Sequence, residues 1–218
     1  GAFFVAPLLD WPHGTGNRET TMDRRTLLAL SAASLVTAGR AQAQGTVGDD
    51  GLYDEHFLKD SFLEMALDHE EAADQGKALA VLFEQRGCPY CRELHEVNFK
   101  REEIVSYLSE HFDVVQLDMF GSRAVLDFDG EEMEERDLAV KWFVNFTPTM
   151  LFFPPETVGA TSLREAEVFR LPGYFKPFHF ISGLEYVVTQ DYKNQHFQRY
   201  LQDKFAKLAE QGIDPEVW

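Results

Sequence analysis

The sequence has little cysteine, little positive charge and no long hydrophobic run. Among its 218 residues there are two cysteines, and 20 Lys and Arg stand against 37 Asp and Glu, for a net charge of −17. Two cysteines are too few for the disulfide framework of a small stapled extracellular protein. A surface this acidic repels phosphate backbones and anionic lipid, so nucleic acid and membrane surfaces are poor candidates for partners.

The longest apolar run near the N-terminus, Thr26–Ala38, has about thirteen residues, whereas a membrane-spanning helix needs ~20. We therefore expect no stable membrane insertion of the mature chain. The run follows a charged start with the adjacent Arg24 and Arg25 and precedes an Ala-x-Ala site, which completes the pattern of an export signal. The two arginines resemble a twin-arginine signal. We expect export to the periplasm, with cleavage near Ala43.

The signal separates an N-terminal part from one predicted domain. Residues 1–21 precede the signal and have no helical or strand period, so we interpret them as an unstructured upstream segment. Residues 22–43 are the predicted signal peptide, and the Gly- and Asp-rich residues 44–52 are a linker. The remaining residues 53–211 have the length of a single domain.

The predicted domain alternates apolar runs with amphipathic segments. A continuous apolar run such as 78–83 predicts a strand buried on both faces, whereas apolar residues three and four apart predict helices. The expected strands are 78–83, 113–119, 150–153 and 167–171. The expected helices are 53–74, 92–99, 102–110, 134–144, 177–190 and 195–211. This order predicts an α/β fold, a mixed central sheet with helices on both faces.

Residues 125–130 predict a β-hairpin, because the Asp129-Gly130 turn favours positive φ. A Ca²⁺ loop is the alternative, but the spacing and the closing Glu of that loop are missing. Two groups of aromatic residues remain. We expect the first group in the core: Trp142, Phe143, Phe146, Phe152 and Phe153. The second group either lines a groove beside the cysteines or packs under the next helix: Tyr174, Phe175 and Phe178.

The two cysteines form a Cys-x-x-Cys motif between the expected strand 78–83 and a helix. At a helix N-terminus, unpaired N–H groups and the helix dipole stabilise a thiolate, so Cys88 is the predicted nucleophile. Pro89 suits the first helical position, and Tyr90 completes the motif. Cys91 follows one turn later on the same face and is the predicted resolving residue of a thiol–disulfide exchange.

Two other interpretations of the motif stay open. An inert structural disulfide would close so short a loop that it adds little stability by chain entropy. A metal site would need two further ligands, of which His95 is one candidate, and the seven histidines include no second pair at ligand spacing. We expect no bound metal and no cofactor other than a redox-active Cys88–Cys91 disulfide.

The motif resembles the active site of the thioredoxins, and two other positions support the resemblance. Thr147-Pro148 resembles the family's cis-proline loop, in which the proline faces the disulfide and the preceding residue presents its backbone to the substrate; a trans proline at a strand start is the alternative. Gly173 is similar to the glycine near the same groove. The resemblance implies a thioredoxin-like fold with an extra β-hairpin and an additional C-terminal helix, and substrate contacts at these three residues.

The sequence also departs from the thioredoxins. Leu82 occupies the position of their buried acid, and Glu84, the nearest carboxylate, is expected to face the other way at the end of the strand. Gly87 replaces their tryptophan. The extra hairpin and the additional C-terminal helix, together with the export signal, Cys88–Cys91, Phe146–Thr149 and Leu171–Phe175, resemble the exported SoxW-type thioredoxins encoded with bacterial sulfur-oxidation systems.

The resemblance implies a periplasmic thiol–disulfide oxidoreductase that reduces disulfides of protein substrates. It further implies a cysteine-bearing Sox carrier protein as substrate and a membrane electron donor of the DsbD or CcdA type. A disulfide oxidase or isomerase and a cytochrome c maturation reductase are the alternatives within the enzymes. Outside them, a thiol-based metal-binding or delivery module is the alternative.

Overall fold

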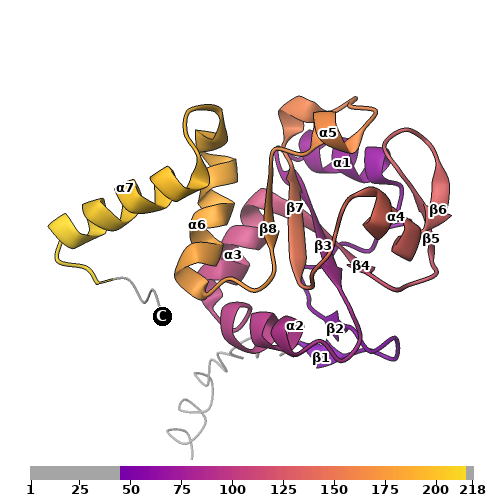
Figure 1. Cartoon of the computed structure of the whole chain (residues 1–218), viewed down its shortest axis with the longest axis horizontal. Helices are drawn as coiled ribbons and strands as arrows, with labels where there is room; N and C mark the ends of the chain where they lie inside the picture. Colours follow the sequence, from indigo (N-terminus) through magenta and orange to yellow (C-terminus); the bar gives the residue numbers. More distant parts are fainter. Residues whose placement is uncertain (1–44, 215–218) are drawn as a thin grey trace, which may run out of the picture. The chain divides into compact units, whose positions relative to one another are not determined.

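The computed structural model describes residues 45–214 (Figure 1). The predicted signal peptide, its cleavage position and the upstream segment 1–21 lie outside these residues. In the described part of the chain, no helix is long and apolar enough to cross a membrane.

A four-stranded mixed sheet forms the centre of the described domain (Figure 1). Its order is β4 (Phe112–Asp118), β3 (Ala78–Glu84), β7 (Thr149–Phe153) and β8 (Phe169–Pro172). β3 pairs in parallel with β4 and antiparallel with β7, and β7 pairs antiparallel with β8. Every residue of β3 is buried, as its continuous apolar run predicts for a strand covered on both faces.

Helices cover both faces of the sheet and enclose two cores. One face carries α1 (Met65–Asp74), α4 (Glu135–Lys141) and the short α5 (Leu163–Ala166). The other carries α2 (Pro89–Glu93) with its π-helical continuation η1 (Leu94–Asn98), α3 (Glu102–His111) and α6 (Pro177–Val188). Because side chains alternate along a strand, Leu79, Val81 and Phe83 enter the first core, and Ala80 and Leu82 the second. The predicted α/β architecture is confirmed.

The predicted helix 53–74 is wrong in its first half. Tyr53–Asp54 is a strand, β2, that pairs with β1 (Thr46–Val47) inside the predicted linker, and α1 begins only at Met65. Leu63 has a φ of 62°, which breaks any helix at this point. Phe62, an apolar residue within the predicted helix, is 92% exposed. The helix ends as predicted before Gly76, whose φ is +73°.

The predicted β-hairpin is present, as β5 (Ala124–Leu126) and β6 (Glu132–Glu134). Gly130 has the positive φ that the turn needs, +81°. One cation lies among the acidic side chains of the loop between the strands, since Lys141 Nζ lies 2.7 Å from Asp127 and 2.6 Å from Asp129.

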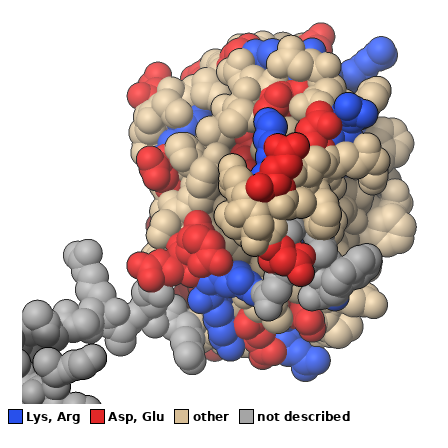
Figure 2. All heavy atoms as spheres, turned by 90° about the vertical axis from the view of Figure 1, so that its left-hand side faces the viewer, with Lys and Arg blue, Asp and Glu red and all other residues tan. Residues whose placement is uncertain are grey.

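The last two elements are short η3 (Asp191–Lys193) and the predicted C-terminal helix, α7 (Phe197–Glu210). Lys204 of α7 donates hydrogen bonds to Ser182 and Glu185 of α6. No residue of α7 is fully buried. Figure 2 shows this side of the domain, where acidic and basic side chains occur together.

Candidate redox site

The two cysteines lie where β3 gives way to α2. Gly87, just before Cys88, has a φ of +71° and allows the sharp turn from β3 into α2. Cys88 caps the helix, and its Sγ accepts a hydrogen bond from the Cys91 N–H at 3.0 Å. The two cysteines are joined by a disulfide, with their Cα atoms 5.2 Å apart. Pro89 occupies the first helical position, where its missing N–H costs no hydrogen bond.

The two cysteines are not equally accessible. Cys91 is 1% exposed, and Cys88 is 5% exposed at the helix N-terminus. Tyr90, between them, is 62% exposed. The N–H groups of the first turn face Cys88, so a thiolate formed there by reduction is stabilised more than one at Cys91. The roles of Cys88 as nucleophile and Cys91 as resolving residue stay predictions.

The loop that precedes β7 lies against Cys88. The Thr147–Pro148 peptide bond is cis. Thr147 Oγ1 donates to Cys88 Sγ at 3.4 Å, and the Thr147 carbonyl oxygen lies 3.6 Å from the same sulfur. Gly173, at a φ of +90°, donates its N–H to the Pro148 carbonyl at 2.7 Å. The cis-proline loop therefore contacts the Cys88 sulfur directly, and Gly173 is held against this loop through the Pro148 carbonyl.

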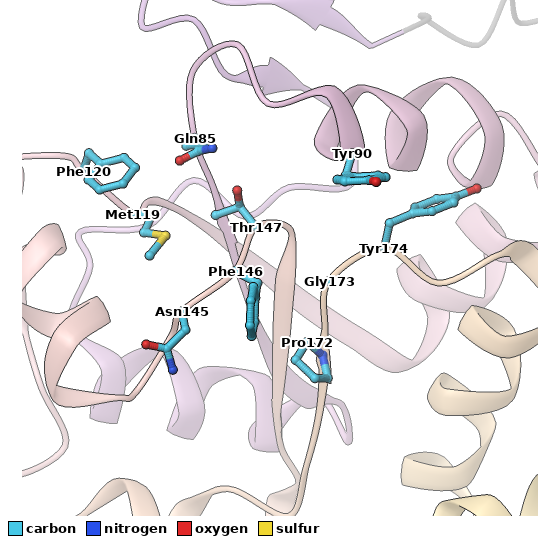
Figure 3. A pocket seen from close by; sticks show the side chains of 10 residues that line it. All are labelled: Gln85, Tyr90, Met119, Phe120, Asn145, Phe146, Thr147, Pro172, Gly173 and Tyr174. Carbon is cyan, nitrogen blue, oxygen red and sulfur yellow. The ribbon is translucent and has the colours of Figure 1, made fainter.

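A groove of about 620 Å³ opens beside the motif (Figure 3). In the close-up view, Tyr90 and Tyr174 lie on one side, Met119 and Phe120 on the other, and Thr147 between them. None of the residues that line it in the described part of the chain is charged. They are Gln85, Tyr90, Met119, Phe120, Asn145, Phe146, Thr147, Pro172, Gly173 and Tyr174.

The structure corrects part of the aromatic prediction. Trp142, Phe152 and Phe153 are buried as expected, but Phe143 is 74% and Phe146 is 64% exposed. These two follow α4 in the loop that leads to the cis peptide bond, where no strand or helix turns them inward. Phe146 lines the groove.

Of the second aromatic group, Tyr174 lines the groove, whereas Phe175 packs against the second core. Phe178 lies under the ammonium group of Lys204, 5.3 Å from the ring centroid. Four further residues line the groove that were not among the predicted site residues: Gln85, Met119, Phe120 and Asn145. Gln85, Met119 and Phe120 directly follow the carboxyl ends of β3 and β4. Ligands commonly bind at this edge of α/β sheets, so the ends of the predicted strands could have indicated these three residues.

The expectation for Glu84 was wrong. Residues two apart on a strand face the same side, so Glu84 shares the face of Leu82 and contacts the helix that carries the cysteines. His95 Nε2 lies 3.0 Å from Glu84 Oε1, and His95 Nδ1 lies 2.9 Å from Glu55 Oε1. Burial lowers the pKa of His95, but the hydrogen bonds with Glu55 and Glu84 outweigh it and leave this pKa raised. Within residues 45–214 no group of His, Cys, Asp and Glu is arranged to hold a metal.

A family model described as a thioredoxin-like domain matches residues 65–188, more than half of the chain. The chain belongs to this thioredoxin-like family. The match includes both cysteines, Thr147, Pro148 and Gly173, and it leaves β1, β2 and α7 outside. The mixed sheet between two helical layers is thus a thioredoxin-like fold.

Solved structures with this fold resemble the chain at low sequence identity. A thioredoxin-fold protein from Helicobacter pylori is 20% identical over 69% of this chain and 95% of that one, with a TM-score of 0.47. A thioredoxin from Thermus thermophilus is 22% identical over 57% and 84%, with a TM-score of 0.44. A disulphide isomerase from Xylella fastidiosa is 16% identical over 72% and 95%, with a TM-score of 0.36. No curated protein matches the sequence.

Proposed function

We propose that this protein is a thiol–disulfide oxidoreductase that reduces disulfides of partner proteins through Cys88 and Cys91. One observation carries the proposal: the Cys88–Cys91 disulfide caps a helix N-terminus and touches the cis Thr147–Pro148 loop beside an uncharged groove. A structural disulfide needs neither the groove nor the helix cap.

The reaction uses the two sulfurs in turn. The Cys88 thiolate attacks one sulfur of the partner's disulfide, a Cys88–partner disulfide forms, and the partner's other sulfur leaves as a thiolate. The Cys91 thiolate then attacks Cys88 Sγ and releases the second partner sulfur. Two electrons have passed to the partner, and the Cys88–Cys91 disulfide has re-formed. No cofactor besides this disulfide is required.

The chemistry of the groove supports a polypeptide as the substrate. Its lining combines the amides of Gln85 and Asn145 with the exposed rings of Tyr90, Phe120 and Phe146. Side-chain amides hydrogen-bond peptide groups, and exposed aromatic rings bury apolar side chains. An extended segment on either side of the partner's cysteine offers both.

The setting of the reaction is part of the same proposal. The charged start, apolar run and Ala-x-Ala site support export to the periplasm and cleavage near Ala43. The SoxW-type resemblance supports a sulfur-oxidation system with a cysteine-bearing carrier protein as substrate. Because the periplasm is kept oxidising, the reductase then needs electrons from a membrane donor of the DsbD or CcdA type.

The first test is a titration of the purified mature protein in glutathione buffers, with the Cys88–Cys91 disulfide quantified at equilibrium. A reduction potential near or below about −230 mV supports the reductase. A value near about −120 mV makes the protein an oxidant and overturns the direction of electron flow. Failure to form a disulfide in any buffer overturns the redox function and favours the metal-binding alternative.

A further inference from the structure

His95 is buried in the helix behind the cysteines, with a carboxylate at each ring nitrogen. Nδ1 is 2.9 Å from Glu55 Oε1, and Nε2 is 3.0 Å from Glu84 Oε1. All three side chains are at most 5% exposed. An ionised carboxylate only accepts hydrogen bonds, so this geometry needs either two N–H groups on His95 or one protonated carboxyl group. In both arrangements the three residues, which we name the His95 cluster, hold one shared proton and one net negative charge.

Other elements enclose the His95 cluster. Gln116 of β4 donates one amide group to Glu84 Oε2 at 2.6 Å and to the Tyr53 carbonyl at 2.8 Å. The Tyr53 ring stacks on His95 at 4.3 Å, and the Phe99 ring meets it edge-on at 5.0 Å. Arg92 and Glu96 act on the Tyr53 hydroxyl, and Arg123 donates to the Gln116 carbonyl of β4. The cluster is therefore fully built and shielded from solvent.

Glu55 comes from outside the part of the chain that the family model matches. It directly follows β2, and the match begins at residue 65. The same N-terminal hairpin holds the other end of the motif, because Arg86 donates to the Asp50 carbonyl from Nε at 3.0 Å and from Nη2 at 2.6 Å. The hairpin thus contacts the loop before Cys88 and, through Glu55, the helix after Cys91.

The cluster lies on the cysteine face of the helix. Cys88, Cys91 and His95 are three and four residues apart, a spacing that places side chains on one side of a helix. The helix changes to a π turn at Leu94–Asn98, the segment that carries His95. Single π turns are frequent at functional sites. A buried negative charge at this place disfavours a second negative charge on the neighbouring sulfurs.

We propose that Glu55, His95 and Glu84 are positioning residues through which the N-terminal hairpin holds the redox helix, formed by α2 and η1. Their charge makes the Cys88–Cys91 pair more reducing. The inference rests on the proposed oxidoreductase function. Its physical basis is that the net negative charge destabilises the thiolate of the reduced form and leaves the disulfide unaffected. The disulfide is then favoured at equilibrium, and the reduced protein gives up its electrons more readily.

The test compares the wild type with Glu55→Gln and Glu84→Gln in glutathione buffers from about pH 6 to about pH 8. His95 is protonated at the lower end of this range, near its ordinary pKa of about 6.5, and the thiolate is populated toward the upper end, near the ordinary cysteine pKa of about 8.5. Each change removes one carboxylate while His95 keeps a partner that holds its proton. We expect the equilibrium constant for reduction of the disulfide by glutathione to rise about threefold or more in each variant, because less charge opposes the thiolate.

The matched control is Asp68→Asn. Asp68 is also a buried carboxylate, bonded to Ser61 Oγ at 2.5 Å, but it lies on α1 on the other side of the sheet. This variant is expected to keep the wild-type equilibrium constant. If the wild type titrates normally and the Glu55 and Glu84 variants match Asp68→Asn, the inference is wrong and the proposed function stands. If the wild type forms no reversible disulfide, the proposed function fails and the inference fails with it.

A second measurement needs no variant and covers the case in which a changed protein does not fold. Linkage is reciprocal, so if the His95 cluster opposes the thiolate, the thiolate must also favour the proton on His95. We expect the imidazole resonances of His95 in the wild-type protein to titrate with a higher pKa in the reduced form than in the oxidised form. Equal pKa values in the two forms would overturn the inference.

Discussion

At the residue scale, the two sulfurs differ in what surrounds them. Cys88 Sγ faces the N–H of Cys91 and the hydroxyl of Thr147 and belongs to a residue that is 5% exposed, whereas Cys91 is 1% exposed. A hydrogen-bond donor stabilises a thiolate, and exposure admits a partner's disulfide. We therefore expect Cys88 to be the attacking sulfur and Cys91 the resolving one.

The first prediction follows from this asymmetry. Cys91→Ser is expected to stop at the mixed disulfide and accumulate a covalent complex with an oxidised protein substrate, because nothing attacks Cys88 Sγ. Cys88→Ser is the control and should form no complex. Non-reducing electrophoresis with intact-mass analysis measures both. Trapping by Cys88→Ser instead would reverse the two roles.

The second prediction concerns two buried histidines with opposite shifts. The pKa of His95 is raised, so its contribution to stability is complete below the unfolded pKa of about 6.5 and is lost as the pH rises through its folded pKa. Burial lowers the pKa of His69, so its contribution is present above about pH 6.5 and is lost as the pH falls through its folded pKa.

Urea unfolding of the wild type, His95→Gln and His69→Gln between pH 5 and 9 measures both effects. The free-energy difference between wild type and His95→Gln should shrink as the pH rises, and the difference for His69→Gln should shrink as the pH falls. If the free-energy difference changed with pH in the same direction for both variants, the opposite pKa shifts of His95 and His69 would be contradicted.

At the element scale, the loop after α4 decides what the groove offers. Phe143 and Phe146 both leave the core here, but only Phe146 lines the groove. Phe143 adopts a φ of 55°, a conformation that is uncommon for a bulky residue. The two residues are similar in exposure and differ in position, so they form a natural pair for a test.

The third prediction uses this pair. Phe146→Ser is expected to lower kcat/KM for a protein disulfide roughly three- to tenfold, since about 1 kcal/mol of apolar contact with the substrate is lost. Phe143→Ser should leave kcat/KM near the wild-type value. Both variants should unfold at wild-type urea concentrations, because the rings are exposed. Equal losses in the two variants would show that the groove does not select the substrate.

The fourth prediction concerns the β5–β6 hairpin. Lys141→Met removes the cation that meets Asp127, Asp129 and Glu131. Asp127 is 3% exposed and would keep its hydrogen bond from Trp142 Nε1 without a compensating charge. We expect a loss of about 1–3 kcal/mol in the free energy of unfolding, measured as a lower urea midpoint with an unchanged slope. Lys100→Met, at an exposed position, is the control and should change little.

At the scale of the whole molecule, segments outside the family match are attached in two different ways. The N-terminal hairpin contributes the buried Glu55, which contacts His95, and the exposed Asp50 carbonyl, which accepts from Arg86 in the loop before Cys88. α7 contributes Phe197 and Tyr200, which pack against Tyr186, and the Lys204 pair with Glu185, but none of its residues is fully buried. The hairpin is therefore part of the site, and α7 is an addition to the surface of α6.

The fifth prediction is that a chain ending after Tyr200 keeps the wild-type reduction potential. It loses mainly half-exposed apolar contacts and the Lys204 ion pair, so the free energy of unfolding should fall by no more than about 2 kcal/mol. Glutathione titration and urea unfolding measure the two quantities. A changed reduction potential would show that α7 affects the stability of the Cys88–Cys91 disulfide relative to the dithiol.

Features that depend on neighbouring residues were predictable from the sequence. The run 78–83, the motif at a strand–helix junction, the Asp129-Gly130 turn and the three- and four-residue spacing of the last helix each carry their signal within one segment. The resemblance to thioredoxins added Thr147, Pro148 and Gly173, which lie 59 or more residues from Cys88 in the sequence. In the fold Thr147 contacts the Cys88 sulfur, and Gly173 bonds to the Pro148 carbonyl beside it.

The tertiary structure alone decided the rest. Phe62 and Phe146 are apolar in the sequence yet exposed, because burial depends on which surface packs against a residue and not on its own hydrophobicity. Glu55, Glu84 and His95 are ordinary polar positions until pairing of distant segments places them together, 40 and 11 residues apart. Local pattern thus determined the redox motif and the elements, whereas long-range packing determined the groove and the charge behind the cysteines.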